Sequence, residues 1–227
     1  MLIELSYVLS ETAPKWPTNP DEKYYAITSP EQGDINTTSL VYHHLHNGTH
    51  VDAPRHFDAK GATIEQLAIE DFYFTRPCVL ELSKKKGEQI TLDDLKGKEA
   101  ELADCDILLF YTGYSKLRDT APEEFMNDFP YLSAELARYI RKELPKLKAI
   151  ALDVLSVDSS VLGGQMGYPA HHALLDVNEE NQERTLLIFE DVNVGKLLNV
   201  SGVKEICAFP VRWAGLEAGP VAMVAVV

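Results

Sequence analysis

Five of the seven histidines of this 227-residue chain lie within fifteen residues, between His43 and Phe57. The segment reads His-His-Leu-His-Asn-Gly-Thr-His-Val-Asp-Ala-Pro-Arg-His-Phe, and the two remaining histidines, His171 and His172, are adjacent far downstream. Neutral imidazole is the commonest nitrogen ligand for zinc and related metals. The clustering therefore predicts a metal site, against the alternative of a polar strand face with several solvated histidines.

The spacing within this segment favours convergence on one point. Four potential ligands stand at even positions, which face one side of an extended chain: His46, His50, Asp52 and His56. A helix would also bring two of the histidines together, but Gly48 and Pro54 disfavour a helix. We expect a strand that ends near Gly48 and a tight loop through residues 52–54, with glycine allowing the backbone to bend.

Charge and composition narrow the function classes. A net charge of −14, from 21 basic and 35 acidic residues, argues against nucleic acid and anionic membranes as partners. Length and a 45% hydrophobic content fit one globular domain over residues 1–227, with no linker or repeat. No apolar run approaches the length of a membrane span, and no secretory signal is expected at the N-terminus.

The three cysteines, Cys78, Cys105 and Cys207, are widely separated in the chain. Cys78 and Cys207 stand in apolar runs. This pattern predicts buried free thiols in a reducing compartment rather than disulfides or a sulfur metal site. We therefore expect a cytoplasmic protein.

Apolar runs predict the arrangement of strands and helices. Strands are expected at residues 2–9, 24–27, 39–45, 78–82, 106–112, 149–154, 186–190, 206–210 and 221–227. A helix capped by Ser133 lies between two of these strands, and shorter helices are expected at 63–71 and from Thr91. The strand–helix–strand unit at 106–154 predicts an α/β domain with a central parallel pair. Residues 163–169 are read as a glycine-rich loop, and 176–184 as an exposed polar excursion.

The candidate ligands are three imidazoles and two carboxylates, a mixture that suits zinc, manganese or iron(II) rather than calcium or magnesium. One or two such ions would lower the pKa of a bound water to about 7 and polarise a substrate carbonyl. Asp52 or Glu190 could bridge two ions, and a histidine not committed to metal could move a proton. Trp16, between proline-rich turns, is either a core plug or an aromatic pocket wall.

The segment from His46 to Phe57 resembles the signature of the cyclase family of metal-dependent hydrolases, of the kynurenine formamidase and isatin hydrolase type. The resemblance extends over nearly the whole chain. It includes Glu4-Leu-Ser, Tyr111-Thr-Gly-Tyr, Leu152-Asp-Val-Leu-Ser-Val-Asp158, His171-His-Ala-Leu-Leu, Glu190-Asp-Val-Asn and Gly215-Leu-Glu-Ala-Gly-Pro220.

The resemblance implies a swivelling β/β/α fold of the α/β class, usually oligomeric, here a homodimer or larger. It implies five metal ligands: His46, His50, Asp52, His171 and Glu190. His56 takes the position of the proton donor and acceptor, and Trp16 that of a substrate-contacting tryptophan.

Two departures from the family pattern stand out. The stretch between His171 and Glu190 is longer than usual, so that Glu179, Glu180 or Glu183 is an alternative ligand to Glu190. Tyr111 replaces an arginine of many relatives, which predicts a different pocket. His43, His44 and His172 have no assigned role.

Three functions remain open at this point. The first is hydrolysis of an amide C–N bond, in an N-formyl aromatic amine or a cyclic amide, by metal-activated water with a histidine proton shuttle. The second is a cyclase or dehydratase that acts on a carbonyl compound. The third is a non-catalytic metal-binding module, which would have a closed coordination shell. Trp16 favours the first, because an aromatic substrate is its natural partner.

Overall fold

The computed structural model describes residues 1–178 and 184–227. The strands are β1 (Leu2–Glu4), β2 (Lys23–Thr28), β3 (Thr38–Tyr42), β4 (His50–Asp52), β5 (Tyr73–Phe74), β6 (Pro77–Glu81), β7 (Gln89–Ile90), β8 (Ile107–Tyr111), β9 (Tyr131–Leu132), β10 (Ala149–Leu152), β11 (Leu187–Glu190), β12 (Glu205–Pro210) and β13 (Ala218–Val226). The helices are α1 (Glu99–Leu102), α2 (Pro122–Met126), α3 (Ala134–Glu143), α4 (Gly163–Met166) and α5 (Pro169–Leu175).

Nine of these strands, within the described residues, form one curled sheet in the order β5-β12-β13-β4-β11-β10-β8-β6, with β1 also paired to β13. β5 and β6 stand at opposite edges, yet only Thr75 and Arg76 separate them in the chain. The two edges must therefore lie close together, and the sheet is nearly closed into a barrel. β6, β8, β10 and β11 are parallel, and the remaining pairs are antiparallel.

Alternation along the buried strands divides the core in two. In β8, Ile107 and Leu109 pack inside the barrel with the side chains of β4, β12 and β13. Leu108 and Phe110 face outward and pack with α3 and α5. Both faces of the strand are covered, which is why its sequence reads as an unbroken apolar run.

The strand–helix–strand prediction is confirmed. β8 and β10 are parallel neighbours, and α3 lies between them in the chain. The side chain of Ser133 accepts a hydrogen bond from the backbone N–H of Leu136, as an N-cap residue does. The α/β class predicted from the sequence is thus the class of the structure.

The strand predicted to run through the histidine segment is wrong. β3 ends at Tyr42, a turn follows, and His50–Asp52 forms a separate short strand. Gly48 has a φ of +67°, a left-handed conformation that glycine adopts without strain. The side chains at even positions therefore converge because the chain turns between them, and only His50 and Asp52 share a strand face.

Three other local predictions are also corrected. The helix expected at 63–71 is reduced to a 3-10 turn at Ile69–Phe72, and the one expected from Thr91 is a 3-10 turn at Leu92–Leu95. The glycine-rich segment, expected as a loop, forms α4. Windows of fewer than about ten residues carry too little periodicity to separate these alternatives.

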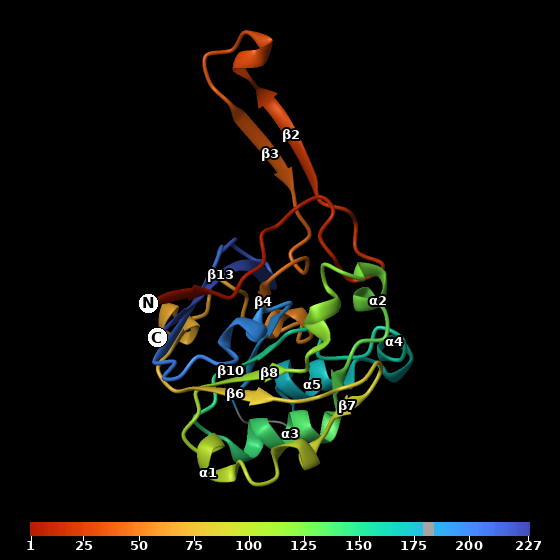
Figure 1. Ribbon diagram of the computed structural model, residues 1–227, viewed down its shortest axis with the longest axis vertical. Coiled ribbons are helices and arrows are strands. Elements are labelled where there is room, and N and C mark those ends of the chain that lie inside the picture. Colours follow the sequence, from red (N-terminus) through yellow and green to blue (C-terminus); the bar gives the residue numbers. More distant parts are fainter. Residues whose placement is uncertain (179–183) are drawn as a thin grey trace.

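Figure 1 shows β2 and β3 as a hairpin that projects well away from the body of the molecule. Cys78 and Cys105 are buried free thiols, and Cys207 is a half-buried one. Across the described ranges, no helix has the length and apolar character needed to cross a membrane.

Candidate metal centre and active-site pocket

Strand pairing places the first candidate ligands. β4 and β11 run antiparallel with His50 directly opposite Glu190, so that both side chains lie on the same sheet face as Asp52. α5 brings His171 over this face. The Nε2 atoms of His50 and His171 each lie 3.5 Å from a different carboxylate oxygen of Glu190. All four side chains are buried.

Asp52 is the centre of the cluster. Its carboxylate oxygens lie 2.9 Å from Nδ1 of His46, 3.4 Å from Nε2 of His50 and 3.7 Å from Nε2 of His171. Its side chain is completely shielded from solvent. A single fully buried carboxylate thus stands among three imidazoles drawn from a turn, a strand and a helix.

The partners of Asp52 are arranged for a cation rather than for hydrogen bonding. Within the described residues, neither oxygen of Asp52 nor Nε2 of His50 has a hydrogen-bond partner, and the short distance to His46 lacks hydrogen-bond geometry. An unpartnered buried carboxylate is strongly destabilising. A divalent ion on these converging atoms would remove that cost, so the residues fit a metal.

Two groups of candidate ligand atoms share Asp52. One consists of His46, Asp52 and His56, and the other of His50, Asp52 and Glu190, with the atoms of each group within 4.8 Å of one another. A carboxylate common to two groups is suited to bridge two ions.

The same contacts set the pKa values of the side chains. Burial lowers the pKa of His50, but Asp52 and Glu190 outweigh it and raise that pKa to about 10. Burial raises the pKa of Asp52, but the imidazoles of His56, His46 and His171 hold it well below its usual range. Protons and metal ions compete for the same nitrogen atoms, so metal binding here would release protons.

His56 has a different environment. It ends the 3-10 turn Pro54–His56 and stacks on His46, with the ring centroids 4.1 Å apart. Burial lowers the pKa of His56 to about 4 despite the nearby Asp52. Its imidazole is therefore neutral near pH 7 and able to accept a proton.

Hydrogen bonds on the far ring nitrogens orient two of the histidines. Nδ1 of His50 donates to the carbonyl oxygen of Gly48 at 2.9 Å, and Nδ1 of His171 donates to Asp158 at 2.7 Å. Asp158 also accepts the backbone N–H groups of Ala170 and His171. These bonds fix the tautomer that leaves both Nε2 atoms free to face Asp52.

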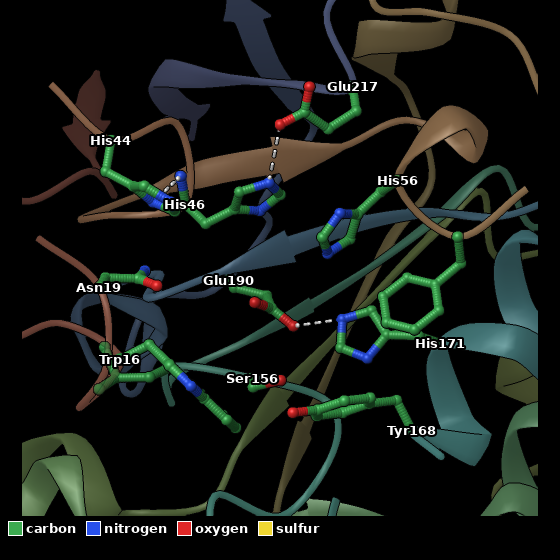
Figure 2. Close-up of a pocket in the computed structure, with 12 residues that line it drawn as sticks. Trp16, Asn19, His44, His46, His56, Ser156, Tyr168, His171, Glu190 and Glu217 are labelled. Carbon is green, nitrogen blue, oxygen red and sulfur yellow. Dashed lines mark hydrogen bonds and ion pairs between the residues drawn. The ribbon is translucent and has the colours of Figure 1, made fainter. Parts of the chain in front are cut away.

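A pocket of about 420 Å³ opens onto this cluster (Figure 2). Trp16 lines it, 6.4 Å from the ring of Tyr168, and also packs edge-on against Phe129 of the core. Both alternatives for Trp16 therefore hold in part. The pocket is lined by Trp16, Asn19, His44, His46, His56, Phe57, Leu155, Ser156, Tyr168, His171, Glu190 and Glu217.

Glu217, to which no sequence pattern gives a role, lies at the pocket 3.3 Å from Nε2 of His46. The hydrogen bond with His46 lowers the pKa of Glu217 to about 2, so the side chain is a carboxylate. Asp158, which hydrogen-bonds with His171, likewise has no signal in the sequence pattern. Both residues stand within segments that carry the family resemblance, but no spacing links them to the histidines they contact.

The three histidines without an assigned role lie in different surroundings. His43 pairs with the buried Glu22 at 2.8 Å, and His44 lines the pocket. His172 pairs with Asp176 outside the pocket.

Glu190 lies in the cluster, whereas Glu179, Glu180 and Glu183 lie outside the described residues. Tyr111 packs inside the barrel and does not line the pocket, so its predicted effect on the pocket is not seen.

We predict that Asp52→Asn loses bound metal. The change keeps the shape of the side chain but removes the charge that three imidazoles and the metal share. Metal analysis of the purified variant after dialysis should give less than a tenth of the wild-type content. The exposed Asp119→Asn is the control and should retain full metal. Full retention by Asp52→Asn would contradict the central position of this carboxylate.

Comparisons with known proteins show the family of this chain. The model of the Cyclase family, described as "Putative cyclase", matches residues 3–159. Kynurenine formamidase of Geobacillus thermodenitrificans (strain NG80-2) is 34% identical over 173 residues, 76% of this chain and 76% of that protein. Kynurenine formamidase of Bacillus anthracis is 26% identical over 224 residues, 96% of this chain and 94% of that protein.

Solved structures share the fold. Isatin hydrolase A from Labrenzia aggregata, bound to benzyl benzoate, has a TM-score of 0.81 at 18% identity and covers 99% of this chain and 93% of its own. A predicted metal-dependent hydrolase from Bacillus stearothermophilus has a TM-score of 0.74 at 22% identity, with 99% and 97% covered. These neighbours confirm the β/β/α fold that the resemblance implied, and the family match spans most of the chain. The protein belongs to the cyclase family.

Proposed function

We propose that this protein is a metal-dependent hydrolase of non-peptide amide C–N bonds, acting on an N-formyl aromatic amine or a cyclic amide. One observation carries the proposal: the buried carboxylate of Asp52 lies against the imidazoles of His46 and His171, and both of these imidazoles line an aromatic pocket. The neutral His56 stands on the pocket wall, and Trp16 offers an aromatic surface across it. An open pocket over the cluster also disfavours a closed, non-catalytic metal site.

We assign the metal to the five candidate ligands, as one or two ions of zinc or manganese. The set of three imidazoles and two carboxylates suits these metals. The ligands are His46, His50, Asp52, His171 and Glu190. When bound, the metal supplies a nucleophile at neutral pH and polarises the scissile carbonyl.

The protein side chains supply the remaining chemistry. His56 accepts the proton lost from the attacking water and returns it to the leaving nitrogen, which needs protonation to depart. Trp16 orients an aromatic substrate by ring contact. Asp158 keeps the His171 ring in place through its Nδ1 hydrogen bond.

The relatives support this substrate class. Those with 34% and 26% identity are named kynurenine formamidase, and the structural neighbours include an isatin hydrolase bound to the product analogue thioisatinate. We further propose a homodimer or larger assembly of one domain spanning residues 1–227. A cytoplasmic location is supported by the buried free thiols of Cys78 and Cys105.

The direct test is turnover of N-formylkynurenine by the purified protein, with and without a chelator. We expect release of formate that stops when metal is removed and returns when zinc or manganese is added. Isatin serves as the cyclic amide comparison. Activity that survives complete metal removal would refute the proposal, as would no hydrolysis of either substrate by the metal-loaded protein.

We predict that His56→Ala retains most of its metal but loses turnover. Removing a positioned acid–base group typically costs about 10²–10⁴-fold in rate. Kinetics and metal content should be measured on the same preparation. An unchanged kcat would exclude the proton-transfer assignment, and loss of metal would make His56 a ligand instead.

Trp16→Ala should raise the KM for N-formylkynurenine about fivefold and leave kcat nearly unchanged, because it removes an aromatic contact of about 1 kcal/mol. Trp16→Phe keeps a ring at the same position and should recover most of the affinity. If Trp16→Ala changes only the Tm, the tryptophan belongs to the core alone.

A further inference from the structure

Trp16 and Asn19 form one wall of the pocket (Figure 2). They are the ends of a tight turn, in which the backbone N–H of Asn19 donates to the carbonyl oxygen of Trp16 at 2.9 Å. Nζ of Lys15 donates to the carbonyl oxygen of Asn19 at 2.6 Å and holds the end of this turn. A flat aromatic surface and a polar amide group therefore stand together, within the reach of one small ligand.

The side chain of Asn47 contacts Asn19 from outside the pocket lining, and only 2% of it is exposed. Nδ2 of Asn47 donates to Oε1 of the buried Glu22 at 2.7 Å and to the carbonyl oxygen of Pro20 at 3.2 Å. A backbone carbonyl oxygen can only accept a hydrogen bond. These two acceptors use both hydrogens of the Asn47 amide and fix which end of that amide is the nitrogen.

Asn47 in turn fixes the amide of Asn19. Oδ1 of Asn47 can only accept, and Nδ2 of Asn19 donates to it at 3.0 Å. A flipped Asn19 amide would place two acceptor oxygens against each other. Oδ1 of Asn19 is therefore the atom left for the pocket, and Figure 2 shows it turned toward the pocket interior. Within residues 1–178 and 184–227, no side chain or backbone group donates to this oxygen.

The neighbourhood of Trp16 indicates which donor this oxygen meets. A ring that packs against Trp16 brings its own substituents closest to Asn19, because both side chains come from one turn. The two substrate types of the proposed function share one such donor, an N–H bonded directly to the aromatic ring. In an N-formyl aromatic amine it is the anilide N–H, and in isatin it is the lactam N–H. In both, this nitrogen belongs to the bond that is cleaved.

We propose that Asn19 determines specificity by accepting a hydrogen bond from the N–H of the scissile amide, which restricts the enzyme to secondary amides. This inference rests on the proposed amide hydrolase function and narrows its substrate class. A nitrogen that carries an alkyl group would leave the Asn19 oxygen without a donor. A site built to hydrogen-bond a substrate N–H rejects the analogue that lacks it. Asn47 holds the acceptor in place before the substrate arrives, which lowers the entropic cost of binding.

The test compares isatin with N-methylisatin, which differ only in the group on the ring nitrogen. Each is measured as a competitive inhibitor of N-formylkynurenine hydrolysis, or by kcat/KM if isatin is the substrate that the metal-loaded enzyme turns over. We expect the wild type to favour isatin by about tenfold or more. Asn19→Ala should reduce this preference to about twofold or less, mainly by weakening the binding of isatin. Asn127→Ala removes an exposed amide outside the pocket and should keep the wild-type preference.

The outcomes separate the role of Asn19 from the proposed function. Circular dichroism and metal analysis should show the same fold and metal content in Asn19→Ala as in wild type. Equal affinity of the wild type for both compounds would overturn the inference. So would a preference for isatin that persists in Asn19→Ala, or an equal loss of affinity for both compounds in that variant. A metal-loaded protein that hydrolyses neither N-formylkynurenine nor isatin would instead refute the proposed function.

A second variant tests how the acceptor is oriented. Asn47→Ala leaves every pocket-lining side chain in the chain but removes the amide that orients Asn19. The released Asn19 amide can rotate, so the preference for isatin should fall to a value between those of wild type and Asn19→Ala. The Tm of the variant, measured alongside, shows that it is folded at the assay temperature. A full wild-type preference in Asn47→Ala would reject Asn47 as the residue that positions Asn19.

Discussion

The antiparallel pairing of β4 with β11 is the contact on which the site depends. It sets His50 opposite Glu190 and leaves Asp52 on the same face, two residues along. β4 has only three residues and lies between β11 and β13, so none of its side chains reaches solvent. Ionisable groups placed there have lost their water, and they stay charged only by sharing a partner. The sheet therefore places ionisable side chains where a cation would stabilise them.

A buried ion pair next to this contact holds it in position. Arg118 donates two hydrogen bonds, of 2.8 and 2.7 Å, to Asp191, which follows Glu190. Thr49, which precedes His50, donates to the carbonyl oxygen of Asp191 at 2.6 Å. Arg118 also stacks over Tyr7, 3.8 Å from its ring centroid. Residues adjacent to His50 and Glu190 are thus tied to one framework, in a region where an unpaired charge would cost several kcal/mol.

The sequence predicted those parts of the site that residue type and clustering mark, and it did not predict contacts that only the tertiary fold makes. Residue type and clustering were enough to select the histidines and Asp52, and a strand end was enough to prefer Glu190. The β3–β4 turn was missed because alternation alone cannot distinguish one strand from two strands joined by a turn. The tertiary fold alone brings Glu217 to His46 and Asp158 to His171. An isolated carboxylate in a sequence carries no periodic signal. The family was predicted from a long motif, and the comparisons confirmed it.

The pairing of β1 with β13 has a consequence for folding during synthesis. Leu2 pairs with Val226, and β13 is also a neighbour of β4. When the ribosome has made the histidine segment, β1 and β4 still lack β13, the strand that will pair with each of them. The pairings of β1 and β4 with β13 have very large sequence separation, which makes folding slow and leaves strand edges exposed meanwhile. The nascent chain therefore carries the candidate ligands His46 and His50 long before it has a sheet to hold them, and chaperone binding to these edges would protect it in that interval.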